Sequence, residues 1–326
     1  MTSLPASNEP VIIIGSGLSG LVAATELIQR KIKTVFVDQE NENSLGGQAY
    51  WSLGGLFCVN STDQREMGIK DSRELAMQDW LGSAGFDRED KQDYWPRRWA
   101  EAYVNFATDE LENYVKKRGL KFASVEWIER GSGDVNGHGN SVPRMHIAWG
   151  CGPGVLRIFA DPVKVAAASK DPLVEFKFRH RVDEIVVDVN TGAAIGVRGQ
   201  VLEPSDAPRG VATSRSLTGS SFDIRGRAVL IASGGIGGNL EAIKKHWPVD
   251  KLGPRVPQSF VIGVPAHVDG RMLDIAQETG ASIVNTDRMW HYTEGMQNWN
   301  PIWPVCLAST IPSFIGLISS SYMAFG

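Results

Sequence analysis

The sequence predicts an α/β fold that is built around a parallel sheet, and three observations support this prediction. A strand-like run enters a glycine-rich turn at residues 11–20, a helical segment and a second strand follow, and a short strand far downstream ends in another glycine cluster. The composition is typical of a globular protein, because 42% of the 326 residues are hydrophobic and 21% are charged.

The first unit covers residues 11–38. We expect a buried strand at Val11–Ile14, a helix at Leu18–Arg30 and a second strand at Lys33–Asp38. A strand, a helix and a strand in this order form a βαβ unit, whose crossover is right-handed and whose two strands are parallel.

The turn between the first strand and the helix reads Gly-x-Gly-x-x-Gly. Gly15 permits the tight turn, Gly17 lets backbone N–H groups approach a diphosphate, and Gly20 lets the helix lie close to the strand. The helix N-terminus adds partial positive charge. Asp38 ends the second strand, where a carboxylate can accept hydrogen bonds from ribose hydroxyls. The alternative is an ordinary helix-capping turn beside a solvated acid, but this placement favours a dinucleotide site.

A helical insert is predicted at about residues 70–120. Residues 71–119 have helical character throughout, and Ser72 is the expected N-cap of the first helix. An aromatic stripe recurs close to helical spacing in this insert, and we interpret it as core rather than as a cofactor contact: Trp99, Tyr103, Phe106, Leu111 and Tyr114.

In the second half of the chain the spacing of apolar residues changes from a helical to a strand-like pattern. Residues 149–154 are expected to form a glycine-rich loop, as are residues 131–140, and a short alanine-rich helix is expected to open at Asp161. Residues 173–189 alternate as a pair of strands would, and a hairpin turn is expected at Asn190.

A polar segment and a last strand follow this hairpin. Residues 201–221 are rich in proline, serine and glycine and are predicted to be an exposed loop. Ala228–Ala232 is expected to be a short buried strand that runs into the glycine cluster at residues 233–239.

A second glycine-rich loop distinguishes between the possible cofactors. SLGGQAYWSLGGLF, at residues 44–57, directly follows the strand that Asp38 ends and carries two pairs of glycines. NAD needs no such loop, whereas a longer cofactor that lies along the chain can use its backbone donors. The pattern favours a flavin, and an NAD-dependent Rossmann enzyme is the less favoured alternative.

At this point the sequence resembles a known family, the FAD-dependent oxidoreductases of the fumarate reductase and 3-ketosteroid dehydrogenase type. Four segments within residues 11–300 match that family in order: VIIIGSGLSGLVAATEL with Asp38, GGQAYWSLGG, IASGGIGGN and AHVDGRMLDIAQETGA. Asp38 stands where the family usually has Glu, Gln48 replaces Asn, and Ser233 replaces Thr. The resemblance implies a Rossmann-like FAD-binding domain with a parallel sheet, a helical insert and an incomplete capping domain.

The resemblance also implies which residues contact FAD. The following positions are carried over for the diphosphate and the adenosine ribose: Gly15, Gly17, Leu18, Ser19, Gly20, Asp38, Gln39, Gly46, Gly47 and Gln48. The remaining positions are carried over for the flavin, the adenine and the adenosine end: Ser52, Gly54, Gly55, Leu56, Val182, Ala232, Ser233, Gly234, Asp269 and Gly270. For Val182, a role in the strand core alone is an equal alternative.

Against this family the chain is expected to be truncated at its C-terminus. We expect an FAD-binding domain at residues 1–283, the start of a capping domain at 284–304 and an aberrant apolar tail at 305–326. The tail matches no family segment and reads like an out-of-frame or unspliced translation, because no charged residue follows Glu294. A tail anchor is the alternative, which the serines and the missing basic flank disfavour.

The resemblance implies hydride transfer between flavin N5 and a carbon–carbon bond that a carbonyl or carboxylate activates. His291 and Tyr292 are the catalytic candidates, because they fall near a substrate-binding His of the fumarate reductases; a buried structural His is the alternative. The substrate is expected to be a small molecule, either steroid-like or a dicarboxylate. A non-catalytic cofactor-binding fragment is the alternative function.

Composition and charge exclude several other classes. A net charge of −4 gives no reason to expect nucleic acid as a partner, and neither the three cysteines nor the histidines have metal-ligand spacing. No signal peptide precedes the first strand, so we expect a cytoplasmic protein without membrane association.

Overall fold

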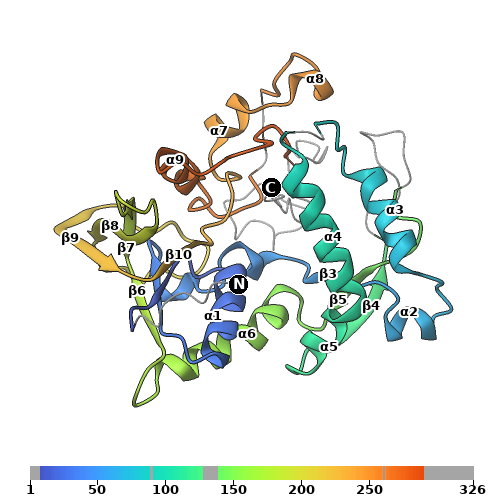
Figure 1. The fold of residues 1–326 in the computed structure, drawn as a ribbon, viewed down its shortest axis with the longest axis horizontal. Coiled ribbons are helices and arrows are strands. Elements are labelled where there is room, and N and C mark those ends of the chain that lie inside the picture. The colour runs from blue at the N-terminus through green and yellow to red at the C-terminus, as the bar shows by residue number, and fades with distance from the viewer. Residues whose placement is uncertain (1–7, 89–90, 128–138, 259, 261, 290–326) are drawn as a thin grey trace, which may run out of the picture.

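The computed structural model describes residues 8–88, 91–127, 139–258, 260 and 262–289. One face of a central parallel sheet is covered by a three-stranded antiparallel sheet and the other face by two helices. A mostly helical insert lies beyond these helices (Figure 1). The predicted α/β class is therefore confirmed.

The central sheet has four parallel strands in the order β10-β1-β2-β6. These strands are β1 (Val11–Ile14), β2 (Thr34–Asp38), β6 (Val174–Phe178) and β10 (Ala228–Ile231). Val11 lies opposite Ala228 on one side and Thr34 on the other, so β1 occupies the middle of the sheet. Because all four strands run in one direction, their carboxyl ends share one edge, where ligands bind in open parallel sheets.

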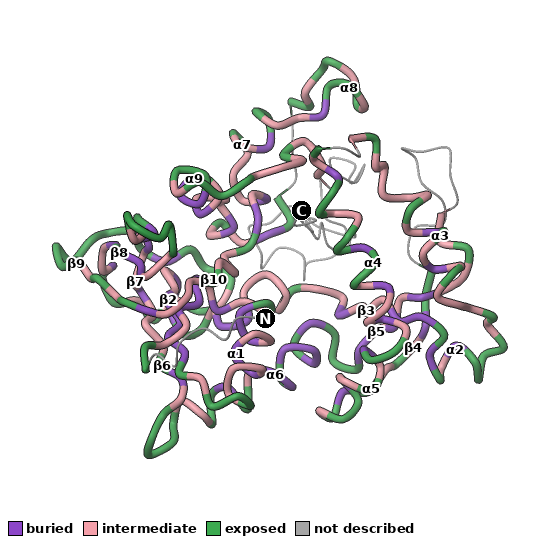
Figure 2. Tube along the Cα trace, viewed as in Figure 1, coloured by how far each residue is buried: buried purple, intermediate pink, exposed green. Residues whose placement is uncertain are grey.

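Two helices cover one face of this sheet, namely α1 (Leu18–Gln29) and α6 (Cys151–Ala167). The sheet contributes Ile13 and Phe36 to the apolar core beneath them, and the helices contribute Leu21 and Phe159. Most of β1 and β2 is buried, as Figure 2 shows for β2, whereas β6 and β10 are mostly half-buried. Burial of these β-branched and aromatic side chains is what holds α1 against β1.

An antiparallel sheet covers the opposite face. It consists of β7 (His180–Val187), β8 (Ala194–Leu202) and β9 (Leu217–Arg225) in that order. Ile12 and Val35 of the central sheet pack against Val182 and Val197 in a second apolar cluster. Ile275 of α9 (Arg271–Glu278) belongs to the same cluster. The predicted hairpin at Asn190 is confirmed as the β7–β8 connection.

Three sequence-based expectations about this region were wrong. Residues 173–189 form two strands that do not pair with each other, because β6 joins the central sheet and β7 joins the antiparallel one. Arg179 lies between them with φ +62°, and this left-handed residue redirects the chain. Part of the predicted loop at 201–221 is the start of β9, which pairs with β8. Residues 149–154 are no simple loop, because α6 already begins at Cys151 and Asp161 lies well inside it.

The insert contains helices and a small sheet. Its elements are β3 (Gly55–Phe57), α2 (Thr62–Glu66), α3 (Arg73–Ser83), α4 (Tyr94–Asp109), α5 (Leu111–Lys116), β4 (Phe122–Glu126) and β5 (Met145–Ala148). The predicted N-cap is confirmed, because the Ser72 hydroxyl accepts from the N–H of Leu75. The aromatic stripe packs against the core except at Trp99, which is 62% exposed and was wrongly predicted to be buried.

A buried ion-pair cluster joins the two sides of the insert. The guanidinium of Arg144 donates to Asp71 at 2.8 Å and to Asp79 at 2.6 Å, and all three side chains are almost fully buried. Beside them the Nδ1 of His146 lies 2.8 Å from the Arg144 carbonyl oxygen, and its Nε2 lies 2.6 Å from the Ser61 hydroxyl. No local sequence pattern marks this cluster, because its members are far apart in the chain.

Short elements complete the described chain. They are the 3₁₀ helices η1 (Glu42–Ser44) and η2 (Gly47–Trp51) and the helices α7 (Leu240–Lys245) and α8 (Val249–Leu252). No helix within the described ranges has the length and apolar character needed to cross a bilayer. The predicted tail at 305–326 lies outside the described residues, and the division into an FAD-binding and a capping domain stays a prediction.

Candidate cofactor-binding site

The first glycine turn lies at the carboxyl ends of β1 and β10. Gly15 has φ +95°, which favours glycine, and its N–H donates to the Val37 carbonyl oxygen at 2.9 Å. A Cβ at this position would lie 2.6 Å from the Ala232 carbonyl oxygen, and one on Gly20 would lie 2.5 Å from the carbonyl oxygen of Gly15. The turn therefore touches the third glycine cluster and leaves no room for a side chain at either position.

The N-terminus of α1 is open. Gly17 is its N-cap, no side chain accepts from its first N–H groups, and its first turn carries no acidic residue. A Cβ on Gly17 would make only ordinary contacts, the nearest with the Ala232 carbonyl oxygen at 3.9 Å, so this position is not crowded. The N–H groups of a helix's first turn, together with the positive end of the helix dipole, favour an anion there.

The second glycine loop lies directly beside this turn. The N–H of Gly46 donates to the Ser16 carbonyl oxygen at 2.9 Å, and Gly46 also forms an isolated parallel bridge with Gly17. A Cβ on Gly47, whose φ is +56°, would lie 3.3 Å from the Cα of Gly17. Two backbone segments that are far apart in sequence thus lie side by side.

The far end of this loop is packed against α6 and the insert. The Ser52 carbonyl oxygen accepts from the N–H of Gly152 at 2.9 Å. Gly54 has φ +74°, and a Cβ there would lie 2.4 Å from the carbonyl carbon of Cys151. Gly55 and Leu56 belong to β3, which pairs with β5. These four predicted flavin contacts therefore have structural roles, and their contact with a flavin stays a prediction.

The third family-like segment, at residues 231–239, and the fourth, at residues 266–281, pack against each other. The N–H of Gly238 donates to the Val268 carbonyl oxygen at 2.7 Å, and the Asn239 side-chain amide donates to the Asp269 carbonyl oxygen at 3.1 Å. Gly270 has φ +75°, and a Cβ there would lie 2.4 Å from Ile236. Since Gly15 touches Ala232, all four glycine-containing segments meet at one edge of the central sheet.

Asp38 has a second role that the sequence did not reveal. One of its carboxylate oxygens accepts from both the N–H and the hydroxyl of Ser16, and the other accepts from the N–H of Glu40 at 2.8 Å. An ionised carboxylate has about four acceptor positions, so one is left for a ribose hydroxyl. Asp38 therefore fixes the glycine turn at residues 15–20, which we call the phosphate turn, to β2. Its contact with ribose stays a prediction.

Val182 is buried in β7, and its carbonyl oxygen accepts from the Arg271 guanidinium at 2.7 Å. Arg271 directly follows Asp269 and Gly270, so this bond ties the antiparallel sheet to the fourth segment. The adenine contact that was predicted for the Val182 backbone stays a prediction, and its carbonyl already has one partner within the protein.

A loop that the sequence predicted only as exposed lies along the segment between β2 and the second glycine loop. We call residues 203–215 the strap. The Asn41 side-chain amide donates to the carbonyl oxygens of Ser205 and Ala207 at 3.1 and 2.8 Å. The Thr213 hydroxyl donates to the Glu40 carboxylate at 2.8 Å. Only polar composition marked this segment in the sequence, and nothing there indicated its partner.

Arg179 fastens both ends of the strap. Its guanidinium donates to the Glu203 carbonyl oxygen and to the Thr213 hydroxyl, both at 2.8 Å, and it also donates to the Gln39 carbonyl oxygen. Arg179 is 7% exposed, and burial lowers the pKa of its guanidinium although Glu40 acts in the opposite direction. A single buried side chain thus holds the strap against the end of β2, beside the predicted site residue Gln39.

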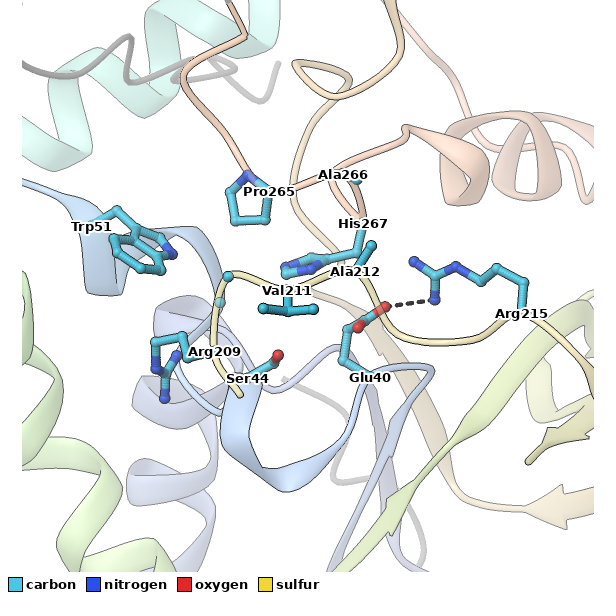
Figure 3. A pocket seen from close by; sticks show the side chains of 12 residues that line it. Glu40, Ser44, Trp51, Arg209, Val211, Ala212, Arg215, Pro265, Ala266 and His267 are labelled. Carbon is cyan, nitrogen blue, oxygen red and sulfur yellow. Dashed lines mark hydrogen bonds and ion pairs between the residues drawn. The ribbon is translucent and has the colours of Figure 1, made fainter. Parts of the chain in front are cut away.

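A cavity of about 70 Å³ lies between the strap, the second glycine loop and residues 265–267 (Figure 3). Its lining includes Glu40, Ser44, Gly47, Trp51, Arg209 and His267. Ligand pockets usually measure roughly 300–1,000 Å³, so this cavity can take only one part of a dinucleotide. The rest of such a ligand would extend from this cavity toward the N-terminus of α1.

The cavity contains two arginines with different surroundings. Arg215 lies 2.5 Å from the Glu40 carboxylate, which balances its charge. Arg209 donates to the Leu45 carbonyl oxygen at 2.8 Å and lies over the Tyr50 ring at 3.9 Å. Burial lowers the pKa of Arg209, and it has no carboxylate partner among the described residues.

The predicted catalytic residues His291 and Tyr292 lie outside the described residues. Ser19 and Leu18 lie in the first turn of α1, as expected for the diphosphate site, and Gln48 lies in η2. Ser233 and Gly234 follow β10 directly. The structure therefore gathers the predicted cofactor positions at one place, and the contacts of each with a cofactor stay predictions.

The open sheet, the glycine turn at its edge and the open N-terminus of α1 define a dinucleotide-binding protein of the Rossmann-like class. A family model described as the FAD binding domain matches residues 10–309, and the chain belongs to this family. Its cofactor is FAD. The site fits that group, because a Cβ on Gly17 would meet no atom closer than 3.9 Å and because Gly15 and Gly47 have left-handed backbone conformations that favour glycine, so no side chain covers the turn at these positions.

Two sequence relatives are named KsdD-like steroid dehydrogenase. The one from Mycolicibacterium smegmatis is 57% identical over 295 residues, which are 90% of this chain and 52% of that protein. The one from Mycobacterium tuberculosis is 55% identical over 294 residues, which are 90% of this chain and 50% of that protein. The chain thus spans about half the length of these relatives.

Solved structures share the fold. A flavocytochrome c3 fumarate reductase in an open conformation aligns with a TM-score of 0.59 at 19% identity, covering 85% of this chain and 41% of that one. The 3-ketosteroid delta1-dehydrogenase of Sterolibacterium denitrificans, in complex with 1,4-androstadiene-3,17-dione, aligns with a TM-score of 0.55 at 13% identity and covers 87% and 57% of the two chains.

Proposed function

We propose that the chain is the FAD-binding portion of an oxidoreductase that acts on a carbon–carbon bond next to a carbonyl or carboxylate group. The observation that carries this proposal is the meeting of four glycine-containing segments before the open N-terminus of α1. The names of the two relatives support a steroid-like substrate rather than a dicarboxylate.

Each group of residues has a defined part in this proposal. FAD, when bound, supplies the hydride acceptor or donor at N5. The N–H groups at the start of α1 and at Gly46 and Gly47 stabilise the diphosphate, and Asp38 accepts from the ribose. His291 and Tyr292 are proposed to transfer the proton that accompanies the hydride. We assign the orientation of the substrate to residues that follow the segment at 266–281.

A cofactor-binding product without turnover is the second candidate. It is favoured by the observation that the chain spans about half the length of its relatives. Under this candidate the FAD contacts are the same, and only the proton-transfer and substrate-binding steps are missing. An NAD-dependent enzyme is not proposed, because the chain belongs to the FAD binding domain family.

The experiment is an absorption titration of the purified chain, followed by anaerobic addition of substrate. Oxidised flavin bands in the protein fraction support FAD binding, and their bleaching by a 3-ketosteroid supports the oxidoreductase. Bleaching by dithionite alone, with no response to a 3-ketosteroid or to reoxidation by fumarate, supports the second candidate. A folded chain that retains no flavin contradicts both.

A further inference from the structure

We propose that Arg209 is a cofactor-binding residue that stabilises the FAD diphosphate, and that the strap holds it in place. The inference deepens the proposed function, since it rests on FAD binding at the same site. It assigns a charge from the connection between β8 and β9 to a site that is otherwise built from backbone N–H groups and a carboxylate.

The position of Arg209 is the first reason. Its Nη2 donates at 2.8 Å to the carbonyl oxygen of Leu45, the residue that immediately precedes Gly46 and Gly47. Arg209 and Gly47 line the same cavity, which Figure 3 shows between the strap and the second glycine loop. Gly47 in turn lies against Gly17 at the start of α1. The guanidinium therefore lies beside the loop that borders the predicted diphosphate position.

The charge of Arg209 is the second reason. Glu40 balances Arg215, and Asp183 balances Arg271, which are the neighbouring arginines of the site. Arg209 contacts only a carbonyl oxygen and an aromatic ring within the part of the chain that the structure describes. A half-buried cation without an anion is unfavourable, and an arginine fork is well suited to phosphate oxygens. A diphosphate would supply the missing negative charge.

The rigidity of the strap is the third reason. Asn41 binds it on one side of Arg209, and Arg179 and Glu40 bind it on the other through Thr213. Asn43 adds a bond to the Ala207 carbonyl oxygen at 3.0 Å. These contacts fix Arg209 before a ligand arrives, so little conformational entropy remains to be lost on binding. A loop with no role at the site would not need so many anchors along residues 39–45.

The test compares FAD affinity in the wild-type chain, Arg209→Gln and Arg209→Lys, measured by quenching of flavin fluorescence at low and high salt. Arg209→Gln is expected to weaken FAD binding about 10- to 100-fold, the range of a charge-assisted hydrogen bond. Arg209→Lys retains the charge and is expected to recover part of this loss. The salt dependence of the dissociation constant should fall in the Gln variant, because one charge has been removed.

The matched control is Arg227→Gln, which removes an equal charge next to the amino end of β10, at the opposite edge of the sheet. It should bind FAD as the wild type does. Equal affinity of Arg209→Gln and wild type overturns the inference. A loss of affinity with unchanged salt dependence, and no recovery in Arg209→Lys, also overturns it, since Arg209 would then only position the loop. A wild-type chain that binds no FAD overturns the proposed function itself.

Discussion

The hydroxyl and the N–H of Ser16 both donate to the same carboxylate oxygen of Asp38, at 2.6 and 2.7 Å. This pair of bonds closes the phosphate turn onto the end of β2. On its other side the same turn is in contact with Ala232 at the end of β10. The turn is therefore fixed by both strands that flank β1, which prepares its N–H groups for an anion before any ligand is present.

Ser16→Ala should destabilise the cofactor-free chain by about 1–2 kcal/mol, because one oxygen of Asp38 loses a short hydrogen bond. Urea unfolding followed by circular dichroism measures this change. Ser19→Ala is the control, since Ser19 is an exposed serine nearby, in the first turn of α1. Equal midpoints for the two variants would show that the Ser16–Asp38 bond contributes nothing.

Gly15→Ala should abolish retention of FAD. The new Cβ would lie 2.6 Å from the Ala232 carbonyl oxygen, and the φ of +95° disfavours alanine. The ratio of flavin to protein after purification measures this effect. Gly68→Ala separates the two causes, because Gly68 has φ +74° but no atom within 4 Å of the added Cβ. This control should keep its FAD; if it also loses FAD, the loss does not come from the phosphate turn.

Arg144→Met should destabilise the chain by about 3–5 kcal/mol, because Asp71 and Asp79 would be left as buried charges without a partner. The change is expected in thermal unfolding as well as in urea. Arg198→Met is a control at an exposed arginine that pairs with Glu184 and Asp223, and it should change little. A variant at Arg144 that is as stable as this control would contradict the structural role.

His146 should make stability depend on pH. Its Nδ1 faces the Arg144 carbonyl oxygen and donates to it, so in the neutral ring Nε2 accepts from the Ser61 hydroxyl. Burial lowers the pKa of His146 below 6.5 in the folded chain, so the unfolded chain binds more protons in acid. The contribution of His146 to the free energy of unfolding is therefore fully present above about pH 6.5, and it is lost as the pH decreases toward the folded-state pKa.

Melting temperatures of the wild type and of His146→Gln between pH 7 and pH 5 test this dependence. The wild type should lose more stability than the variant across that interval. His246→Gln, at the end of α7, is the control and should follow the wild type. Parallel curves for the wild type and the His146 variant would rule out this source of acid sensitivity.

The two described cysteines should differ in reactivity. Cys58 is fully buried, and burial raises its pKa to about 12, whereas Cys151 is exposed at the start of α6. In a Cys306→Ser background, a thiol reagent should modify one cysteine rapidly and the second only in denaturant. Mass spectrometry of the labelled peptides identifies them. Rapid modification of Cys58 in the native chain would mean that the core around it opens readily.

The main elements of the site could be predicted because they depend on local patterns. Val11–Ile14 and the glycine turn after it are read directly from a β-branched run and its spacing, and the predicted βαβ unit is confirmed. The order of the sheet needed one further inference, that the strand at Ala228 joins this unit. The glycine cluster that follows this strand supplied that inference, and the structure pairs Ala228 with Val11.

The features that could not be predicted depend on contacts between distant segments. Nothing near Arg179 in the sequence indicates that a left-handed residue separates two strands into different sheets, because a strand pair gives the same alternation. The strap has no periodicity, and one of its partners, Asn41, lies more than 160 residues earlier in the chain. Trp99 was predicted to be buried but is exposed, because helical spacing marks a face of the helix without showing whether another element covers it.

The pairing of Val11 with Ala228 has a consequence for biosynthesis. While the ribosome is still making the intervening segments, β1 has a partner on one side only, and its other edge exposes unsatisfied backbone groups that can associate with other nascent chains. The chain cannot acquire FAD during this interval, because Ala232 is not yet available to support the turn. Flavin incorporation therefore reports that translation has passed β10, and the yield of yellow protein should depend on how well chaperones protect that edge.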